Sequence, residues 1–206
     1  MGLELDYIDG QTPLDEEEKD GLLIPTIATR GELDEFEQQN IEQAVQWTLG
    51  RSFKPDAVFT EAFIRMVHKR MYADVWAWAG EFRKTNKNIG VDKWQIQSDL
   101  KYLLDDVKYW HENNIYPPDE IALRFKHRIV SIHCFPNGNG RHSRLMADII
   151  IEKIYKKPVF TWGAALSFSK GAVNLSSEGD ARATYLKAVK AADQGDYSLL
   201  LAFAHS

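Results

Sequence analysis

The sequence predicts an all-α protein in which two amphipathic helices are joined by a tight, glycine-rich loop. Apolar residues recur at helical spacing on both sides of that loop. Those before it are Ile121, Phe125, Ile129 and Ile132, and those after it are Met146, Ile150 and Ile154. The loop segment, residues 133–144, reads His-Cys-Phe-Pro-Asn-Gly-Asn-Gly-Arg-His-Ser-Arg. We therefore expect one helix to end at His133 and the next to open at Gly140 and Arg141.

Other helical segments precede and follow this pair. Thr29, with Glu32 three positions later, has the form of a capping box that opens a helix. An amphipathic helix follows Pro55, another begins near Asp92, and the helix that leads into the loop begins after Pro118. The final third of the chain is again helical in its pattern. The arm before Thr29 has no periodicity strong enough to predict a core element.

A small β-hairpin is expected in the middle of this helical chain. Residues 83–91 read Arg-Lys-Thr-Asn-Lys-Asn-Ile-Gly-Val, in which turn-forming residues separate two short ends that favour strands. A plain surface connection is the alternative interpretation of the same residues.

Length and composition favour one substantial domain with a small addition. The chain has 206 residues, of which 44% are hydrophobic and 27% are charged, as is typical of a globular protein. We assign residues 1–57 to an N-terminal arm and helix, and residues 58–206 to the main domain. A net charge of −5 argues against a general nucleic-acid binder, and no apolar run is long enough to span a membrane. We expect a cytoplasmic protein with neither a membrane nor a nucleic acid as direct partner.

The loop combines residue types that suit the chemistry of a polyphosphate. A helix N-terminus presents unpaired N–H groups and the positive end of the helix dipole to an anion. Gly138 and Gly140 let the backbone approach a phosphate closely. Asn139 lies between them, where its side chain can donate an N–H to the reacting group.

Two arginines and a histidine complete this set. Arg141 and Arg144 lie three positions apart and share one helix face, so both guanidinium groups can hold phosphate oxygens. His133 lies at the rim, where it can take a proton from an incoming hydroxyl. Together these residues indicate phosphoryl or nucleotidyl transfer with a stabilised anion and a general base.

Each of these residues also has an ordinary structural interpretation. A Gly-Asn-Gly sequence between helices is usually only a turn, and a histidine near a helix end is usually a capping or packed residue. Asp148, four residues after Arg144, can form a helical ion pair with it. Cys134 is the only cysteine, which excludes an intramolecular disulfide, and alternation in the loop directs its thiol away from His133. The combination is more specific than any single residue.

The segment closely resembles the signature of the Fic (Fido) family, His-x-Phe-x-(Asp/Glu)-Gly-Asn-Gly-Arg-x-x-Arg. The matching residues are His133, Phe135, Gly138, Asn139, Gly140, Arg141 and Arg144. The sequence Pro13-Leu14-Asp15 and residues 29–33 resemble the bacterial subgroup called mobile mystery protein B. The resemblance implies a Fic-type helical bundle with a small β-hairpin flap beside the active-site loop.

The resemblance also implies a protein adenylyltransferase, which moves AMP from ATP to a Ser, Thr or Tyr hydroxyl of a target protein. In that interpretation His133 is the general base, and the loop from Gly138 to Gly140 is the anion hole. Arg141 and Arg144 hold the β and γ phosphates of ATP.

The flap and the metal site also follow from the resemblance. The flap, with Asn88, Ile89 and Gly90, would dock an extended target segment by strand-like pairing. The one departure from the signature is Asn137, at the position of the Asp or Glu that normally holds Mg²⁺. An amide oxygen can ligate Mg²⁺ but brings no charge. We therefore expect Asn137 to hold Mg²⁺ weakly, in a slower or more metal-demanding enzyme.

Two other functions stay open beside adenylylation. One is a degenerate Fic fold that acts as a binding or regulatory module; the intact His133 argues against it. The other is a Fic enzyme that transfers a different phosphate-containing group, as kinases and phosphocholine transferases do. The inhibitory motif of many Fic proteins, Ser/Thr-x-x-x-Glu-Gly/Asn, has no strict match, because Thr12 and Glu16 have its spacing but Glu17 follows. The subgroup resemblance implies a small helix-turn-helix protein as regulatory partner.

Overall fold

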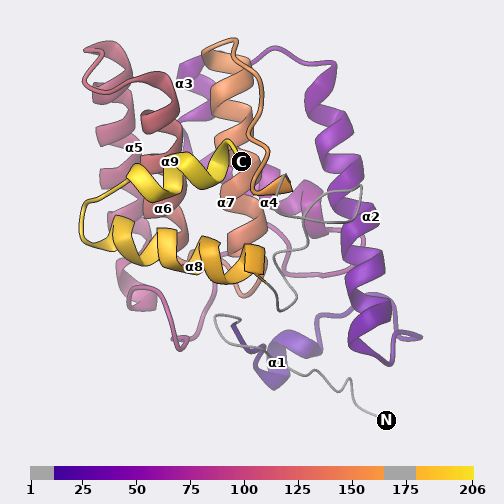
Figure 1. The fold of residues 1–206 in the computed structure, drawn as a ribbon. Helices are drawn as coiled ribbons and strands as arrows, with labels where there is room; N and C mark the ends of the chain where they lie inside the picture. Colours follow the sequence, from indigo (N-terminus) through magenta and orange to yellow (C-terminus); the bar gives the residue numbers. More distant parts are fainter. Residues whose placement is uncertain (1–11, 165–179) are drawn as a thin grey trace.

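Two helices at the centre of the molecule present the loop. In the computed structural model, which describes residues 12–164 and 180–206, α6 (Pro118–Ile132) and α7 (Asn139–Ile149) pack side by side (Figure 1). The loop 133–138 joins the end of α6 to the start of α7. The predicted helix–loop–helix arrangement is therefore confirmed, with the second helix starting one residue earlier than expected.

The other long helices surround this pair. α5 (Ile96–Glu112) packs against α6, and α4 (Glu61–Tyr72) packs against α7 (Figure 1). α2 (Arg30–Leu49) lies on α4, on the side of the molecule opposite α5. α8 (Asp180–Asp193) and α9 (Ser198–Ala204) pack against each other, and α9 contacts α6. The remaining elements are short: α1 (Glu16–Lys19), α3 (Pro55–Val58), a 3₁₀ turn (Lys93–Gln95) and a π-helical turn (Ile150–Ile154) that extends α7.

Capping side chains account for the starts of α2 and α4. The Thr29 hydroxyl accepts a hydrogen bond from the Glu32 N–H at 3.3 Å, and the Glu32 carboxylate accepts one from the Thr29 N–H at 3.0 Å. This is the predicted capping box, and it is confirmed. Thr60 caps α4 by accepting from the Phe63 N–H at 3.2 Å. Side chains thus satisfy N–H groups that the first helical turn leaves without backbone partners.

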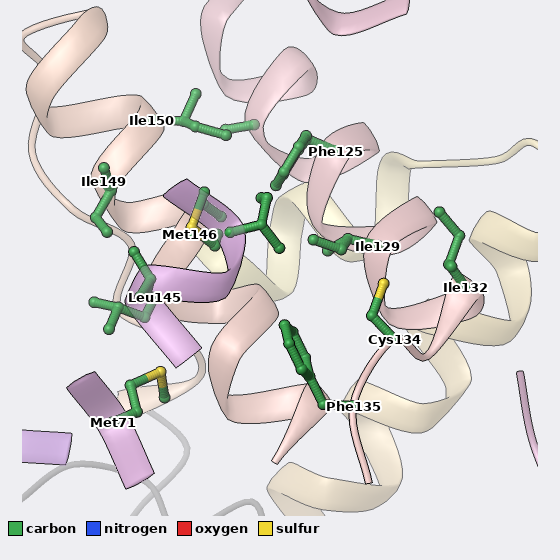
Figure 2. Packing of buried hydrophobic residues seen from close by; sticks show 14 of the residues in the cluster. Met71, Phe125, Ile129, Ile132, Cys134, Phe135, Leu145, Met146, Ile149 and Ile150 are labelled. Atoms are coloured by element: carbon green, nitrogen blue, oxygen red, sulfur yellow. The ribbon is translucent and has the colours of Figure 1, made fainter. Parts of the chain in front are cut away.

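A single hydrophobic core fills the space between α4, α5, α6 and α7. Figure 2 shows the side chains of Phe125, Ile129, Phe135 and Met146 directed into this core from both central helices and from the loop. Cys134 is also fully buried, and burial raises the pKa of its thiol to about 12. A thiol in this environment stays protonated and unreactive at neutral pH. Packing against this core therefore holds the loop on its inner side.

The N-terminal arm is more ordered than its sequence predicts. Leu14 and Ile27 are buried in the core, with 6% and 5% of their surfaces exposed. An isolated antiparallel bridge joins Leu22 to Trp76. The pattern missed these contacts because single buried residues at irregular spacing leave no periodic signal. The division of the chain at residue 57 stays a prediction.

The predicted hairpin is wrong for residues 83–91, which we call the flap segment: it contains turns and bends but no strand. The buried Arg83 side chain takes the place of a ladder, because its guanidinium donates to the carbonyl oxygens of Thr85, at 2.8 Å, and of Val91. Gly90, with φ of +99°, also departs from extended backbone. The two ends of the segment are thus joined through one side chain rather than through paired strands.

Throughout the described part of the chain, every helix is too short or too polar to cross a lipid bilayer.

Candidate active site

Two residues in the left-handed conformation bound the loop. His133, with φ of +59°, ends α6, and Gly138, with φ of +76°, immediately precedes α7. A Cβ atom on Gly138 would lie 2.5 Å from the Tyr72 side chain, so both conformation and space require glycine there. Gly140 differs, because a Cβ atom on it would meet nothing within 4 Å. The lack of a side chain at Gly140 therefore leaves open space rather than relieving a clash.

A buried aromatic layer supports the loop from the core side. We call it the support cluster; its members are His68, Tyr72, Phe135 and His142. The rings of Phe135 and His68 stack with their centroids 3.7 Å apart and their planes 16° apart. The His142 ring meets the Phe135 ring edge-on at 5.1 Å. Phe135 is thus held on two sides, which fixes the loop against α4 and α7.

Hydrogen bonds place both histidines of the support cluster in their neutral form. The Gly80 N–H donates to His68 Nδ1 at 3.0 Å, so His68 Nε2 carries the proton and donates to the Asn137 carbonyl at 3.1 Å. His142 Nε2 donates to the Ile64 carbonyl at 3.1 Å. Burial lowers the pKa of His68 well below its ordinary value and that of His142 to about 4. Sequence reasoning missed His68, which lies on a different helix from the loop it supports.

The Asn139 side chain is hydrogen-bonded within the loop itself. Its Oδ1 accepts from the Phe135 N–H at 3.0 Å, and its Nδ2 donates to the Phe135 carbonyl at 2.8 Å. The amide therefore closes the loop on itself, and the side chain is buried. Its backbone N–H, at the first position of α7, is one of the groups that a helix N-terminus offers to an anion.

Arg83 stabilises the backbone around the histidine. Its Nε donates to the His133 carbonyl at 2.6 Å, and its backbone N–H donates to the Cys134 carbonyl at 3.0 Å. A left-handed conformation at a residue other than glycine costs roughly 1–2 kcal/mol. These bonds hold His133 in that conformation from a segment fifty positions earlier in the chain. No local pattern at Arg83 indicates this role.

His133 is arranged as a neutral base. Its Nδ1 lies 3.3 Å from the Val130 carbonyl, which can only accept, so Nδ1 carries the proton. Nε2 therefore holds a lone pair, and the Thr12 hydroxyl, 2.8 Å away, donates to it. Burial, with smaller contributions from the charges of Arg83 and Lys87, lowers the pKa of His133 to about 4. The imidazole is neutral at pH 7, as a proton acceptor must be.

A cleft of about 370 Å³ opens beside His133 and the N-terminus of α7. Its size is within the range of small-molecule sites, which is roughly 300–1,000 Å³. The loop contributes Asn137, Gly138, Asn139 and Gly140 to its lining, and the flap segment contributes Ile89 and Gly90. Its basic lining residues are Arg30, Arg141, Arg144, Arg182 and Lys190. Asp193 is the acidic residue among the described lining, so this local site is basic in a chain of net charge −5.

The two signature arginines have different partners. Arg141 Nη1 lies 2.6 Å from Glu37 Oε2 of α2, and the Glu37 side chain is only 4% exposed. The other oxygen of Glu37 accepts from Trp76 Nε1 at 2.7 Å. The Arg144 guanidinium lies 5.8 Å from the centroid of the Tyr185 ring on α8. Arg141 thus joins α7 to α2 as well as lining the cleft, whereas Arg144 faces α8.

The sequence allows a helical ion pair between Asp148 and Arg144, but the hydrogen bonds of Asp148 are made with other residues. Its carboxylate accepts from Trp162 Nε1 at 3.1 Å and from the Phe160 N–H at 3.3 Å. Burial raises the pKa of Asp148 to about 7. This carboxyl group lies outside the cleft lining.

The Asn137 side chain fits a metal only weakly. Its Oδ1 accepts from the Gly138 N–H at 2.6 Å, and its Nδ2 donates to the Thr12 carbonyl at 3.2 Å. Among residues 12–164 and 180–206, no three His, Cys, Asp or Glu side chains gather closely enough to hold a metal ion. Mg²⁺ commonly takes one or two carboxylates together with substrate phosphates and water. The side chains present here therefore offer a divalent cation little beyond the Asn137 amide.

The predicted flap residues lie on the surface beside the histidine. Asn88, Ile89 and Gly90 are exposed, and the last two line the cleft. A Cβ atom on Gly90 would lie 2.5 Å from the His133 Cβ atom, so the flap segment passes directly over the base. The structure thus brings these residues to the site, although without the strand that was predicted.

The fold is shared with solved structures, among them one of Fic-1. BepC from Bartonella tribocorum, solved with bound AMPPNP, matches with a TM-score of 0.65 and 17% identity over 93% of this chain and 97% of that one. Fic-1 (residues 134–508) from C. elegans matches with a TM-score of 0.61 and 20% identity over 90% of this chain and 50% of that one. This chain has an all-helical Fic-like fold.

The sequence matches the same family. Residues 58–151 match the Fic/DOC family, and they contain the flap segment and the complete loop. "Protein adenylyltransferase Fic" of Drosophila grimshawi is 31% identical over 107 residues, and that of Drosophila melanogaster is 30% identical over 107 residues. Each match covers 50% of this chain and 22% of the relative, so the chain spans about a fifth of the length of these relatives. Residues 58–151 are therefore similar to a Fic/DOC family domain.

Proposed function

We propose that this protein is a protein adenylyltransferase, which transfers AMP from ATP to a hydroxyl group of a protein. The observation that carries the proposal is the geometry of His133. Its unprotonated Nε2 lies within hydrogen-bond distance of a hydroxyl, at the edge of a basic cleft that the N-terminus of α7 opens. A base, an acceptor hydroxyl and an anion site are thus adjacent, as nucleotidyl transfer requires.

The triphosphate is expected to lie in the cleft along the start of α7. Backbone N–H groups after Gly138 and the guanidinium groups of Arg141 and Arg144 supply the positive potential. The negative charge of the bound triphosphate would raise the pKa of His133 from its value of about 4 and strengthen it as a base. Mg²⁺, held mainly by the phosphates, would neutralise part of that charge. The Drosophila relatives, which are named protein adenylyltransferases, and the AMPPNP in the BepC structure support the choice of an adenylyl donor.

Transfer from ATP labelled at the α-phosphate tests the proposal. We expect wild type to label protein, and His133→Ala to lower the rate by roughly 10²–10⁴-fold, the typical contribution of a general base. Nucleotide affinity should change little, because the cleft arginines and the α7 N-terminus remain. His205→Ala is the matched control, since His205 is exposed and pairs with Asp119 at 3.2 Å. Unchanged transfer by His133→Ala would remove this residue from the mechanism.

The same experiment separates the two alternative functions. Label from the γ-phosphate, but not from the α-phosphate, would indicate a kinase. Nucleotide binding with no transfer of either label would indicate a regulatory module. That alternative is favoured over a metal-dependent enzyme by the Asn137 amide, because both of its polar atoms are hydrogen-bonded within the protein. Label from the α-phosphate alone supports adenylylation.

A further inference from the structure

The N-terminal arm places a hydroxyl of this chain against the base. Thr12 is 6% exposed, and its hydroxyl lies 2.8 Å from His133 Nε2. Asn137 Nδ2 donates to the Thr12 carbonyl at 3.2 Å, so backbone and side chain are both held. Thr12 also lines the cleft together with Gly138 and Gly140, where the phosphates are expected. This hydroxyl therefore occupies the position that the acceptor of the proposed reaction must take.

Contacts between the arm and the flap segment hold this position. The Thr85 hydroxyl donates to the Asp15 carboxylate at 2.5 Å. The Lys87 ammonium lies 3.0 Å from the Asp15 carboxylate and 2.5 Å from that of Glu18, and the Lys87 side chain is 3% exposed. Hydrogen bonds between charged groups are shorter and stronger than neutral ones, more so away from water. Several contacts a few residues from Thr12 thus fix the arm, and they hold the Thr12 hydroxyl beside His133.

The contact differs from an inhibitory glutamate that competes for a signature arginine. Glu16, at the spacing of that motif from Thr12, is exposed and pairs with Lys19 at 2.7 Å. Arg141 pairs with Glu37, which belongs to α2. The arm meets the site through a hydroxyl and a base, which are reactants, and leaves the signature arginines to other partners.

We propose that Thr12 is a modification site, to which the chain transfers AMP from ATP bound in its own cleft; the inference rests on the proposed function. The Thr12 Oγ forms a bond to the α-phosphorus, and the bond from that phosphorus to the oxygen bridging to the β-phosphate breaks. Pyrophosphate leaves with this oxygen, and the hydroxyl proton passes to His133 Nε2. The products are an AMP ester of Thr12, pyrophosphate and one proton.

A reaction of this kind is intramolecular. An acceptor held beside the base on the same chain has a large advantage over one that must diffuse to it. The fractional rate of labelling is therefore independent of protein concentration. A hydroxyl on the same arm that is exposed to solvent, such as that of Thr26, gains no such advantage.

The test uses the purified full chain with ATP labelled at the α-phosphate, and peptide mass spectrometry to locate the AMP group. The expected result is one AMP on Thr12, at a fractional rate unchanged by dilution. Thr12→Val removes the hydroxyl at nearly constant shape and should abolish self-labelling, Thr12→Ser should retain it, and Thr26→Val should label as wild type does. Asp15→Asn, which weakens the contact with the flap segment, should slow labelling of Thr12 without changing ATP affinity.

A mixing experiment distinguishes transfer within a chain from transfer between chains. His133→Ala protein keeps Thr12 but lacks the base, whereas Thr12→Val protein keeps the base but lacks the acceptor. Mixed together with labelled ATP, they should leave Thr12 of the His133→Ala chain unlabelled. Label on that chain, or AMP on other residues of wild type with Thr12 unmodified, would overturn the inference.

Failure of the inference is separable from failure of the proposed function. Wild type that binds ATP and labels proteins of a cell lysate, but never its own Thr12, would keep the function and overturn the modification site. Wild type that neither binds ATP nor labels any protein would overturn both.

Discussion

The two faces of the loop between α6 and α7 are held in different ways. The inner face rests on the support cluster, where neutral rings stack and every contact is buried. The outer face meets the cleft, where the groups are charged or carry reactive protons and their partners come from the arm, the flap segment and α8. A change on the inner face should therefore affect the free energy of unfolding first. A change on the outer face should affect nucleotide binding or transfer first.

Arg141 is the sharpest exception to this division, so it should show the largest effect on stability. Arg141→Ala leaves the carboxylate of Glu37 buried without its cationic partner. Removing one member of a buried ion pair typically costs about 3–5 kcal/mol. We expect a fall of this size in the free energy of unfolding, measured by urea denaturation. Adding Glu37→Gln to the variant should recover part of the loss, and no recovery would show that the charge of Glu37 is not the cause.

Arg144→Ala is the matched variant on the outer face. Its guanidinium contacts the Tyr185 ring but has no carboxylate at ion-pair distance among the described residues. We expect ATP binding to weaken by about 1.5–3 kcal/mol, the usual contribution of a hydrogen bond to a charged group. The melting temperature should change much less than in Arg141→Ala. Unaltered ATP affinity with a large fall in melting temperature would make Arg144 structural.

The two loop glycines provide a second matched pair. Gly138→Ala forces a methyl group into a left-handed residue 2.5 Å from Tyr72, and we expect a loss of about 1–3 kcal/mol in stability. Gly140→Ala meets nothing in the protein, so its unfolding curve should match wild type. Its methyl group is expected to crowd the phosphate, which isothermal titration with ATP would detect. Equal stability losses in both variants would contradict the distinction between the two faces.

The neutral histidines predict a smaller effect, which depends on pH. His133 and His142 have pKa values of about 4 in the folded protein, below the value of 6.5 expected when unfolded. Between these values the unfolded state binds more protons, so stability is present above about pH 6.5 and is lost as pH falls toward 4. Asp148 acts in the opposite direction, because its pKa is raised from 3.8 to about 7, so the stability it contributes at low pH is lost as the pH rises between these values.

Urea unfolding at about pH 7.5 and about pH 5 measures the balance of these groups. We expect lower stability at the acidic pH, since buried histidines outnumber the opposing carboxyl group. His142→Gln should reduce the difference between the two pH values. Asp148→Asn should enlarge it, because the group that offsets the loss is removed. A wild-type stability that rises on acidification would contradict the assignment of neutral histidines.

Asn137→Asp should give the smallest effect and concerns only the outer face. A carboxylate at this position adds a charged ligand for Mg²⁺, so half-maximal transfer should require less metal. The rate at limiting Mg²⁺ should rise, and the free energy of unfolding should fall by only about 1 kcal/mol, because the donor lost from Asn137 makes a single partly buried hydrogen bond to the Thr12 carbonyl. A metal titration of both proteins measures this. Weaker ATP binding with no better response to metal would show that the site is built around the amide, and would favour a metal-independent or non-ATP reaction.

The sequence by itself predicted the helix–loop–helix, the capping box at Thr29 and those residues of the segment 133–144 that line the cleft. It did so because these features are local: a helix shows its period within a few turns, and the loop residues adjoin one another in the chain. The flap segment was predicted as a hairpin because its turn formers and flanking residues are locally consistent with one. In the structure the two ends of this segment are joined instead through the buried side chain of Arg83.

Only the tertiary structure decided which groups surround the loop. Thr12 reaches His133 across 121 positions of the chain, His68 reaches the Asn137 carbonyl across 69, and Arg83 reaches the His133 carbonyl across 50. Such contacts depend on how whole helices pack, which no local pattern encodes. The protonation of His133 has the same origin, because its pKa is set mainly by burial under residues distant in the sequence. The sequence therefore determined the chemical groups of the site, and packing decided their charge, orientation and partners.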